Sequence, residues 1–384
     1  MKKISEYQRN LREMKTQAQD PVYTSTLFFD CQIPVKFIYL WNIEVSHSTY
    51  MDIHKILVIR LSSIGDIVLA SPLVRALRKQ YPSASIDFAI KKEFAVLMQY
   101  NPYINQLILV DSKDMTTAQK QVKENNYDWI IDIQRSSRAS QLMHGSDAPL
   151  ATSYSKQKWA RFFLVQYKWN LYKQVKPVYQ RYFEAVEKQG VKDDGTGTEI
   201  FLTFAEEKKV LALLPFLETN QPVVTICPGA KFNNKRWTKE GFIEVSRQLQ
   251  SLHQAHIVVL GGPGEEALCQ EIATSIGGKV SNLAGQLSLL ESAAVLKHSR
   301  VVVANDSGLM HLAQSQKTPV VAIYGPTVKE FGFFPLETHS TVLETQLGCR
   351  PCTKMGRDTC PKGHHHCMKW ITPADVYTAV QKYL

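Results

Sequence analysis

The segment KILVIRLSSIGDIVLASP, residues 55–72, joins a run of aliphatic residues to a stretch with helical spacing. A continuous aliphatic run such as 55–61 is typical of a strand buried on both faces of a parallel sheet. A helix is predicted to follow. Either Ser71 and Pro72 begin it, or Pro72 lies in an early turn of a helix that begins nearer Asp66. A buried strand followed directly by a helix is the unit of an α/β fold, so this segment predicts the fold class.

Asp66 is unexpected at this junction between strand and helix. Nucleotide-binding folds usually present backbone N–H groups to a phosphate at such a place. A carboxylate there would repel a phosphate. Asp66 therefore needs a role other than phosphate binding.

The alternation of strand and helix continues along the chain. Thr238 can cap one helix, and Ser288 with Glu291 forms a capping box that opens another. The predicted buried strands lie at 55–61, 85–90, 106–111 and 128–133, and then at 222–228, 256–262, 300–306 and 319–326. We therefore expect two doubly wound, Rossmann-like α/β domains, with ligands at the carboxyl ends of strands that face a cleft.

The length of 384 residues is about twice that of a typical domain, which also favours two domains. We expect one domain over residues 51–205 and a second domain over residues 206–384. Residues 1–50 are either a genuine extension, which we expect to be disordered, or untranslated sequence before a start at Met51. A chain that starts at Met51 is expected to fold, because the first core strand follows it.

Composition restricts the class of partner. The formal net charge of +10 favours an anionic partner, yet no nucleic-acid-binding motif accompanies it. No dinucleotide-binding fingerprint follows the first strand of either domain, which disfavours a dehydrogenase. The apolar run 35–45 is too short to span a membrane, and seven cysteines are too few for a secreted disulfide scaffold. We therefore expect a cytoplasmic protein.

Polar residues gather where the predicted strands end. NDSGLMHLA (305–313) follows one strand, and its helix start could hold a diphosphate, although Asp306 or Ser307 could equally be only a helix cap. CPGAKFNNKRW (227–237) follows another strand, and Lys235 could bind a phosphate or be a solvated surface lysine. A third loop, GGPGEEA (261–267), contains Glu265 and is a poor pyrophosphate cradle.

Four motifs occur in a fixed order: RLSSIGD (60–66), NNKRW (233–237), NDSGLMHLA (305–313) and VAIYGPT (321–327). In this order they resemble the bacterial lipopolysaccharide heptosyltransferases of glycosyltransferase family 9, over about residues 53–384. The tail CRPCTKMGRDTCPKGHHHCM (349–368) looks most like the heptosyltransferase II branch. The resemblance implies the GT-B fold, in which two Rossmann-like domains face a cleft. It also implies that residues 51–205 bind the acceptor and that residues 206–384, with the cysteine-rich tail, bind the nucleotide-sugar donor.

The resemblance also implies the role of each motif residue. Asp66 matches the family's catalytic aspartate, a base that takes a proton from the acceptor hydroxyl during an inverting transfer. Lys235 matches the lysine that contacts the donor phosphate, and Glu265 aligns less securely with a donor-contacting glutamate. The donor loop of the family matches Asp306, Ser307, Gly308 and His311. No cofactor or metal is implied, since Lys235 and the helix start can stabilise the leaving diphosphate.

The expected activity is therefore transfer of heptose from ADP-heptose to a lipid A-core acceptor by a monomer. The alternatives are a same-fold transferase with another nucleotide sugar or acceptor, or a nucleotide-sugar-binding protein without turnover. Ala230 and Lys231 occur where the family often has hydroxyl residues. This departure leaves open which sugar or nucleotide the protein prefers. Retention of Asp66 and Lys235 argues against a protein without turnover.

Two further segments allow alternatives. Cys349, Cys352, Cys360 and Cys367 could bind zinc together with nearby histidines, or be reduced thiols that shape a loop; the resemblance implies no metal. Residues 148–183 contain seven basic and no acidic residues, with Trp159, Phe162 and Phe163 at helical spacing. These aromatic residues either pack on the acceptor domain, or meet an anionic inner-membrane surface and a phosphorylated acceptor in a transient contact.

Overall fold

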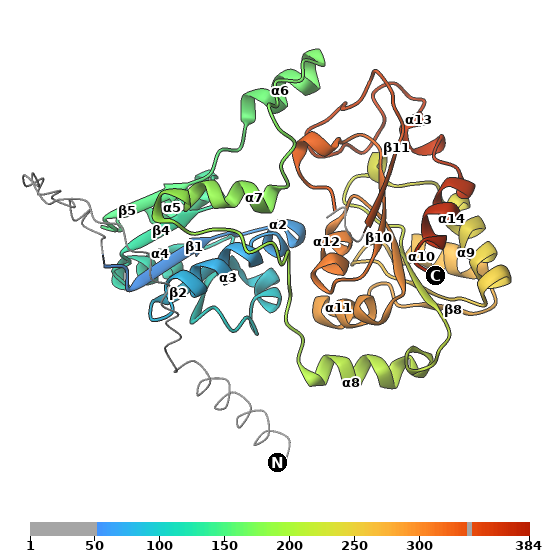
Figure 1. Ribbon diagram of the computed structural model, residues 1–384, viewed down its shortest axis with the longest axis horizontal. Coiled ribbons are helices and arrows are strands. Elements are labelled where there is room, and N and C mark those ends of the chain that lie inside the picture. The colour runs from blue at the N-terminus through green and yellow to red at the C-terminus, as the bar shows by residue number, and fades with distance from the viewer. Residues whose placement is uncertain (1–51, 336–339) are drawn as a thin grey trace, which may run out of the picture. The chain divides into compact units, whose positions relative to one another are not determined.

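The computed structural model describes residues 52–335 and 340–384, so the expectations for residues 1–50 lie outside the described residues. Two parallel β-sheets organise Asp52–Leu384 (Figure 1). The first sheet has the order β3-β2-β1-β4-β5. Its strands are β1 (Lys55–Ile59), β2 (Ser85–Lys91), β3 (Gln106–Val110), β4 (Trp129–Asp132) and β5 (Leu150–Ser153).

The central strand β1 is buried on both faces, as its continuous aliphatic run predicts. Ile56 and Val58 belong to one core cluster, whereas Leu57 and Ile59 belong to another on the opposite face. Such alternation follows from the two-residue period of a strand. The helices that cover this sheet are α2 (Ile64–Val68), α3 (Ser71–Gln80), α4 (Thr116–Glu124) and α5 (Ser137–Met143).

The helical stretch after β1 consists of two helices rather than one. The short helix α2 begins at Ile64 and contains Asp66, and α3 begins at Ser71 with Pro72 near its start. Ala70, and not Ser71, occupies the N-cap position of α3. Both sequence alternatives were therefore partly right, because a helix begins beside Asp66 and a second helix begins at Ser71.

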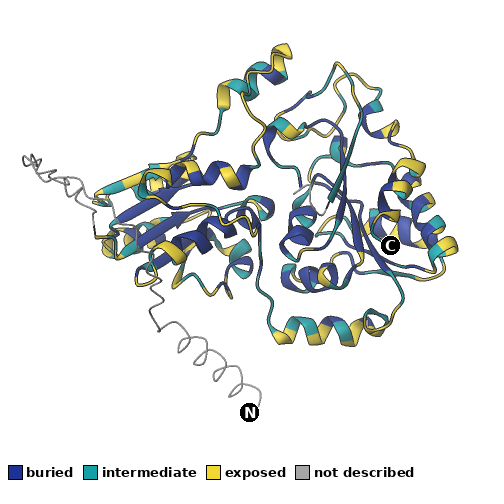
Figure 2. Cartoon of the chain, viewed as in Figure 1, coloured by how far each residue is buried: buried dark blue, intermediate teal, exposed yellow. Residues whose placement is uncertain are grey.

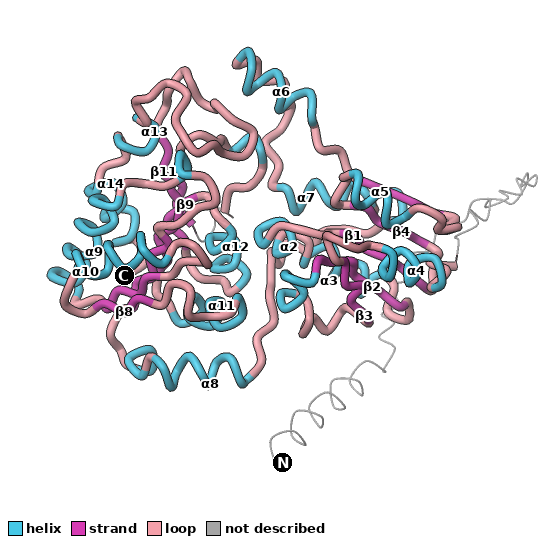
Figure 3. Tube along the Cα trace, turned by 180° about the vertical axis from the view of Figure 1, so that it is seen from behind, coloured by secondary structure: helices cyan, strands magenta, loops and turns pink. Residues whose placement is uncertain are grey.

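The second sheet has the order β11-β10-β9-β6-β7-β8. Its strands are β6 (Val223–Cys227), β7 (His256–Val259), β8 (Val280–Asn282), β9 (Val301–Asn305), β10 (Val320–Tyr324) and β11 (Ser340–Glu344). Its helices are α9 (Lys239–His253), α10 (Glu266–Ile276), α11 (Leu289–His298), α12 (Gly308–Ser315), α13 (His366–Lys369) and α14 (Pro373–Gln381). Figure 3 shows helices around the strands of both sheets. The two α/β halves are therefore present as expected.

Both predicted helix caps are confirmed. The side chain of Thr238 accepts a hydrogen bond from the Gly241 amide at the start of α9. Ser288 and Glu291 form the predicted capping box of α11, in which each side chain bonds to the other residue's backbone.

The strands β5, β8 and β11 were not predicted from the sequence. All three lie at sheet edges, and none has a fully buried residue. An edge strand that is half exposed carries no continuous aliphatic run. The signal that identified the buried strands was therefore missing in these segments.

The chain between the two sheets forms α6 (Lys158–Tyr167), α7 (Val178–Tyr182) and α8 (Phe204–Leu213). The expected boundary between residues 205 and 206 falls within α8. In Figure 2, α6 is half-buried or exposed along most of its length, in contrast to the buried strands, and Leu164 is its only buried residue. Trp159 is 75% exposed, so the alternative in which it packs on the acceptor domain is wrong for this residue, whereas Phe162 and Phe163 are half-buried.

Candidate active site

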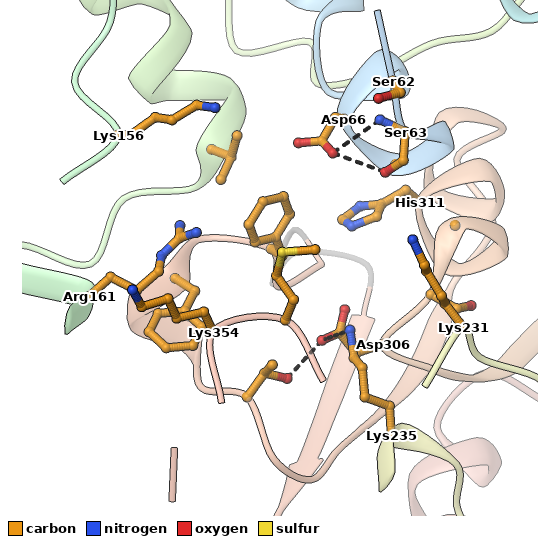
Figure 4. Close-up of a pocket in the computed structure, with 18 of the residues that line it drawn as sticks. Ser62, Ser63, Asp66, Lys156, Arg161, Lys231, Lys235, Asp306, His311 and Lys354 are labelled. Atoms are coloured by element: carbon orange, nitrogen blue, oxygen red, sulfur yellow. Dashed lines mark hydrogen bonds and ion pairs between the residues drawn. The ribbon is translucent and has the colours of Figure 1, made fainter. Parts of the chain in front are cut away.

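A cavity of about 470 Å³ lies where loops and helices of the two halves meet (Figure 4). It is lined from the first half by the β1–α2 segment and from the second half by the β9–α12 segment and the loop after β6. The residues that it takes from these three segments are Arg60, Ser62, Ser63, Gly65, Asp66, Lys231, Phe232, Lys235, Asp306, Ser307, Gly308 and His311. The sequence motifs at three strand ends thus face one cavity.

Asp66 projects into this cavity from α2 (Figure 4). One carboxylate oxygen forms an ion pair with Arg60 and lies 3.4 Å from the Tyr182 hydroxyl. The other oxygen accepts hydrogen bonds from the Ser63 amide (3.3 Å) and the Ser63 hydroxyl (3.0 Å). Burial alone would raise the pKa of Asp66, but Arg60 and the Ser63 hydrogen bonds outweigh it and hold this pKa below its usual value. Asp66 is therefore an ionised carboxylate at neutral pH.

Sequence reasoning missed the two partners of this carboxylate. Arg60 is 5% exposed, donates to the Ile133 carbonyl at 2.6 Å, and lies over the Tyr182 ring at 5.6 Å. A buried arginine is costly unless it is paired, so an arginine at the end of an aliphatic strand was a usable signal for a nearby carboxylate. Tyr182 gave no such signal, because it is 116 residues away from Asp66 in the sequence.

Lys235 and Asp306 form an ion pair on the opposite side of the cavity, with Nζ and Oδ2 2.5 Å apart. The Thr327 hydroxyl donates to the same oxygen of Asp306 at 2.7 Å. Asn305 holds the two loops together, because its side chain accepts from the Trp237 amide (3.0 Å) and donates to the Pro228 carbonyl (2.8 Å). Lys235 is thus a fixed, largely buried cation and not a solvated surface lysine.

The start of α12 leaves polar groups available toward the cavity. Ser307 occupies the N-cap position without a capping hydrogen bond, and its buried hydroxyl has no partner among the described residues. The first N–H groups of any helix also lack partners within the helix. The interpretation of Ser307 as a mere helix cap is therefore wrong, and this end of α12 can accept an anion.

His311 lies one turn further along α12 and is 3% exposed. Burial lowers the pKa of His311, so its ring is neutral at pH 7. Its Nδ1 atom has no hydrogen-bond partner among the described residues. The ring separates Asp66 from the Lys235 pair in Figure 4.

Two glycines allow α2 and α12 to approach each other closely. A Cβ atom on Gly65 would lie 2.5 Å from the His311 ring, and one on Gly308 would lie 3.0 Å from Ile64. Atoms at such distances overlap, so larger residues would force the helices apart. The glycines of the two motifs therefore bring the Asp66 side and the Lys235 side of the cavity together.

Glu265 does not line the cavity, in contrast to the other candidate residues. Its carboxylate accepts from the Gly262 amide at 2.9 Å and lies where a Cβ atom of Gly229 would be. Glu265 thus packs behind the loop that carries Lys235. A contact of Glu265 with the donor stays a prediction.

A second group of cations lines the cavity away from Lys235, as Figure 4 shows. It consists of Lys156, Arg161 and Lys354. Burial, together with the charge of Arg60, lowers the pKa of Lys156 to about 8. Lys156 and Arg161 belong to the basic stretch that the sequence suggested for a membrane surface, and Lys354 belongs to the cysteine-rich tail and was not expected here.

The four cysteines of the tail are free. No group of three or more metal-ligating side chains is arranged for a metal ion in residues 52–335 and 340–384. The Sγ atom of Cys349 lies 4.0 Å from Nε2 of His364. Burial raises the pKa of Cys352, and that of Cys367 to about 11, which favours protonated thiols. The role of these thiols in shaping the loop stays a prediction.

In the described part of the chain, no helix is both long and apolar enough to span a bilayer.

Comparison with known proteins gives one family. Residues 115–362 match the family described as glycosyltransferase family 9 (heptosyltransferase). Lipopolysaccharide heptosyltransferase 2 of Salmonella typhimurium is 27% identical over 342 residues, which cover 84% of this chain and 96% of that protein. A solved family 9 glycosyltransferase of Veillonella parvula is 24% identical with a TM-score of 0.73, covering 86% of this chain and 97% of its own. The solved structure of the ADP-heptose LPS heptosyltransferase II of E. coli is 24% identical with a TM-score of 0.67, and the match covers 86% of this chain and 98% of that chain.

Proposed function

Because the chain belongs to glycosyltransferase family 9 and is a glycosyltransferase, we propose that it transfers heptose from ADP-heptose to an inner-core acceptor of lipopolysaccharide. Similarity to lipopolysaccharide heptosyltransferase 2 over most of both chains supports this acceptor class. The name of the E. coli heptosyltransferase II supports ADP-heptose as the donor. One observation carries the proposal. The ionised carboxylate of Asp66, after a strand of the first sheet, lines the same cavity as Lys235 and the start of α12, which follow strands of the second sheet and suit an anion.

Asp66 would act as the general base. The acceptor hydroxyl oxygen attacks the anomeric carbon, its proton passes to Asp66, and the bond from that carbon to the ADP oxygen breaks. One displacement of this kind inverts the anomeric configuration. The low pKa of Asp66 keeps it ready to accept a proton at neutral pH, and the hydroxyl becomes acidic enough to give its proton only as the new bond forms.

Lys235 and the start of α12 would hold the diphosphate. Negative charge grows on ADP as it leaves, and a fixed cation with helix N–H groups stabilises that charge. Lys235 is already paired with Asp306, so the diphosphate would share this cation with the carboxylate. Ser307 has a free hydroxyl to donate to the same group.

The acceptor would enter from the side of Lys156, Arg161 and Lys354. These three cations lie away from the donor loop, and they suit carboxylate or phosphate groups of an inner-core acceptor. Because that acceptor is lipid-linked, we infer that the enzyme works in the cytoplasm beside the inner membrane. We also infer that it works as a monomer.

A different sugar or nucleotide is the second candidate. Lys231 lines the cavity beside the donor loop, and Ala230 next to it is buried. A cation and a methyl group at these positions offer no hydroxyl to the sugar. The same protein would then transfer another sugar by the same mechanism.

Incubation with ADP-heptose and truncated cores of defined length tests the proposal, with products read by mass. One heptose added to one core length, with equal release of ADP, is the expected result. ADP binding without any transfer would favour the protein without turnover. Transfer from another nucleotide sugar alone would favour the second candidate.

A further inference from the structure

Five aromatic side chains gather on α6 and the residue pair that follows it. Phe163 and Trp169 stack with their ring centroids 6.0 Å apart, and Tyr167 lies 5.4 Å from Trp169. Phe162 and Trp159 complete the cluster through edge contacts. The outer members remain in solvent: Trp159 is 75% exposed, Trp169 60% and Tyr167 54%. These rings pack on one another and leave one side of the cluster uncovered.

Exposure of this kind is costly for a folded protein. Large aromatic surfaces are normally buried, and a contiguous exposed apolar patch usually marks an interaction surface. Leu171 (54% exposed) and Val175 (42% exposed) follow the helix in the sequence and add exposed apolar side chains to this segment. The segment 158–176 therefore presents an apolar surface that no described part of the chain covers.

The charge around the patch is of one sign. Lys158, Lys173 and Lys176 are exposed, and no acidic residue occurs between 148 and 183. Tryptophan and tyrosine prefer the interface between lipid and water, where lysines contact anionic headgroups. A soluble protein partner would need a matching acidic rim, whereas an anionic bilayer meets both features over a wide surface.

The patch is connected to the active site through two cations of the cavity. Arg161 projects from α6, lies over the Phe331 ring at 5.1 Å and lines the cavity. Lys354 also lines the cavity and lies over the Phe162 ring at 5.4 Å. A surface that docks on the patch would thus lie beside the acceptor side of the cavity.

We propose that residues 158–176, the α6 patch, dock on an anionic lipid bilayer and present the cavity to lipid-linked acceptors. The inference rests on the proposed function only for the identity of the acceptor. Trp159, Tyr167 and Trp169 enter the headgroup region, and Lys158, Lys173 and Lys176 contact the anionic headgroups. Lys168 is not part of this contact, because its ammonium donates to the Val165 and Pro351 carbonyls.

Vesicle binding tests the patch without any substrate. The full chain is mixed with phosphatidylglycerol–phosphatidylcholine vesicles or with phosphatidylcholine vesicles, and the bound fraction is measured by flotation. We expect binding to the anionic vesicles that falls with rising salt, since the Debye length shrinks to about 10 Å at 0.1 M. Binding to neutral vesicles should be weak.

Two sets of substitutions divide the patch. Trp159→Ser with Trp169→Ser should abolish binding to anionic vesicles. Lys158→Gln, Lys173→Gln and Lys176→Gln together should weaken it by about fivefold per lysine at low salt. Matched controls should bind like the parent: Phe204→Ser, at a residue 79% exposed on α8, and Lys113→Gln with Lys120→Gln and Lys123→Gln near α4.

Activity separates this inference from the proposed function. With a deacylated, soluble acceptor the patch variants should turn over normally, because none of their residues lines the cavity. With the acceptor in vesicles their KM should rise. Equal binding to neutral and anionic vesicles, or unchanged binding by both patch variants, would overturn the inference. The inference would also be overturned if the parent chain were a dimer and the tryptophan variant a monomer, because a second copy of the chain would then cover the patch. Failure of heptosyl transfer alone would leave vesicle binding intact.

Discussion

The two halves of the molecule each place an aspartate where a buried strand passes into a helix, and the two aspartates have different surroundings. The carboxylate of Asp66, after β1, accepts hydrogen bonds from the amide and the hydroxyl of Ser63. A carboxylate of α2 itself therefore occupies the start of that helix, and we call this the closed junction. Asp306 after β9 instead pairs with Lys235 and Thr327. The hydroxyl of Ser307 at the start of α12 has no hydrogen-bond partner among the described residues, and we call this the open junction.

This difference in contacts is the basis on which we propose opposite roles for the two junctions. A helix start closed by a carboxylate repels phosphate and can hold a base, whereas an open start beside a lysine binds an anion. The carboxylate at residue 66, which looked misplaced in a nucleotide-binding segment, belongs to the junction that would face the acceptor.

The largest effect is expected for Asp66→Asn. The amide retains the size of the side chain but cannot accept the proton, so turnover should fall by about 10²–10⁴-fold, the usual contribution of a positioned base. Steady-state rates with saturating donor measure this effect. Near-normal turnover would show that the closed junction contains no base.

Lys235→Ala removes the cation of the open junction after β9. Loss of a charge-assisted contact to the diphosphate costs about 1.5–3 kcal/mol, so donor affinity should drop roughly 10- to 100-fold, together with the rate. Lys239→Ala is the matched control, since Lys239 lies four residues away, pairs with Glu271 and does not line the cavity. Equal kinetics of the two variants would contradict the role of Lys235.

Gly65→Ala tests the contact between the junctions. The new Cβ would lie 2.5 Å from the buried His311 ring, which must shift, so the free energy of unfolding should fall by about 1–3 kcal/mol. Denaturant titration measures this change. Gly348→Ala is the control, because a Cβ there meets nothing within 4 Å. A loss as large in the control would remove the close approach of α2 and α12 as its cause.

The smallest effect concerns pH. The pKa of Asp66 is held below its usual value by Arg60, so the base of the parent enzyme stays ionised until the pH falls below the usual carboxyl range. Arg60→Gln should raise this pKa and move the acid limb of kcat to higher pH, whereas Arg60→Lys should retain the charge and most of the profile. The same ion pair stabilises the fold above the unfolded pKa of Asp66, and this stability is lost as pH falls through the folded pKa. Identical acid limbs in the parent enzyme and Arg60→Gln would exclude the ion pair as the cause.

The sequence was sufficient for the parts of the fold that local pattern encodes. Buried strands such as β1 and β9 have continuous aliphatic runs, and helix caps such as Thr238 depend on residues three positions apart. The motif residues at strand ends could be grouped because the carboxyl ends of parallel strands lie at one edge of a sheet. All but Glu265 of the predicted site residues accordingly line the cavity.

The remainder depends on contacts between distant residues. No local pattern could show that Tyr182 approaches Asp66 or that Lys354 enters the cavity. The helical spacing of Trp159, Phe162 and Phe163 left open whether this face packs on the domain or meets a membrane, and in the structure these rings pack mainly on one another. Periodicity identifies an apolar face but does not identify what covers it.

The affinity for ADP, measured by titration calorimetry on the parent chain, Asp66→Asn and Lys235→Ala, tests the division of labour between the two junctions most directly. ADP carries the diphosphate but no heptose, so its affinity reports on the junction of Lys235 and α12 and not on the transfer step. We expect Asp66→Asn to bind ADP as the parent does and Lys235→Ala to bind it roughly 10- to 100-fold more weakly. A large loss in Asp66→Asn with none in Lys235→Ala would place the diphosphate at the wrong junction and contradict the proposed arrangement.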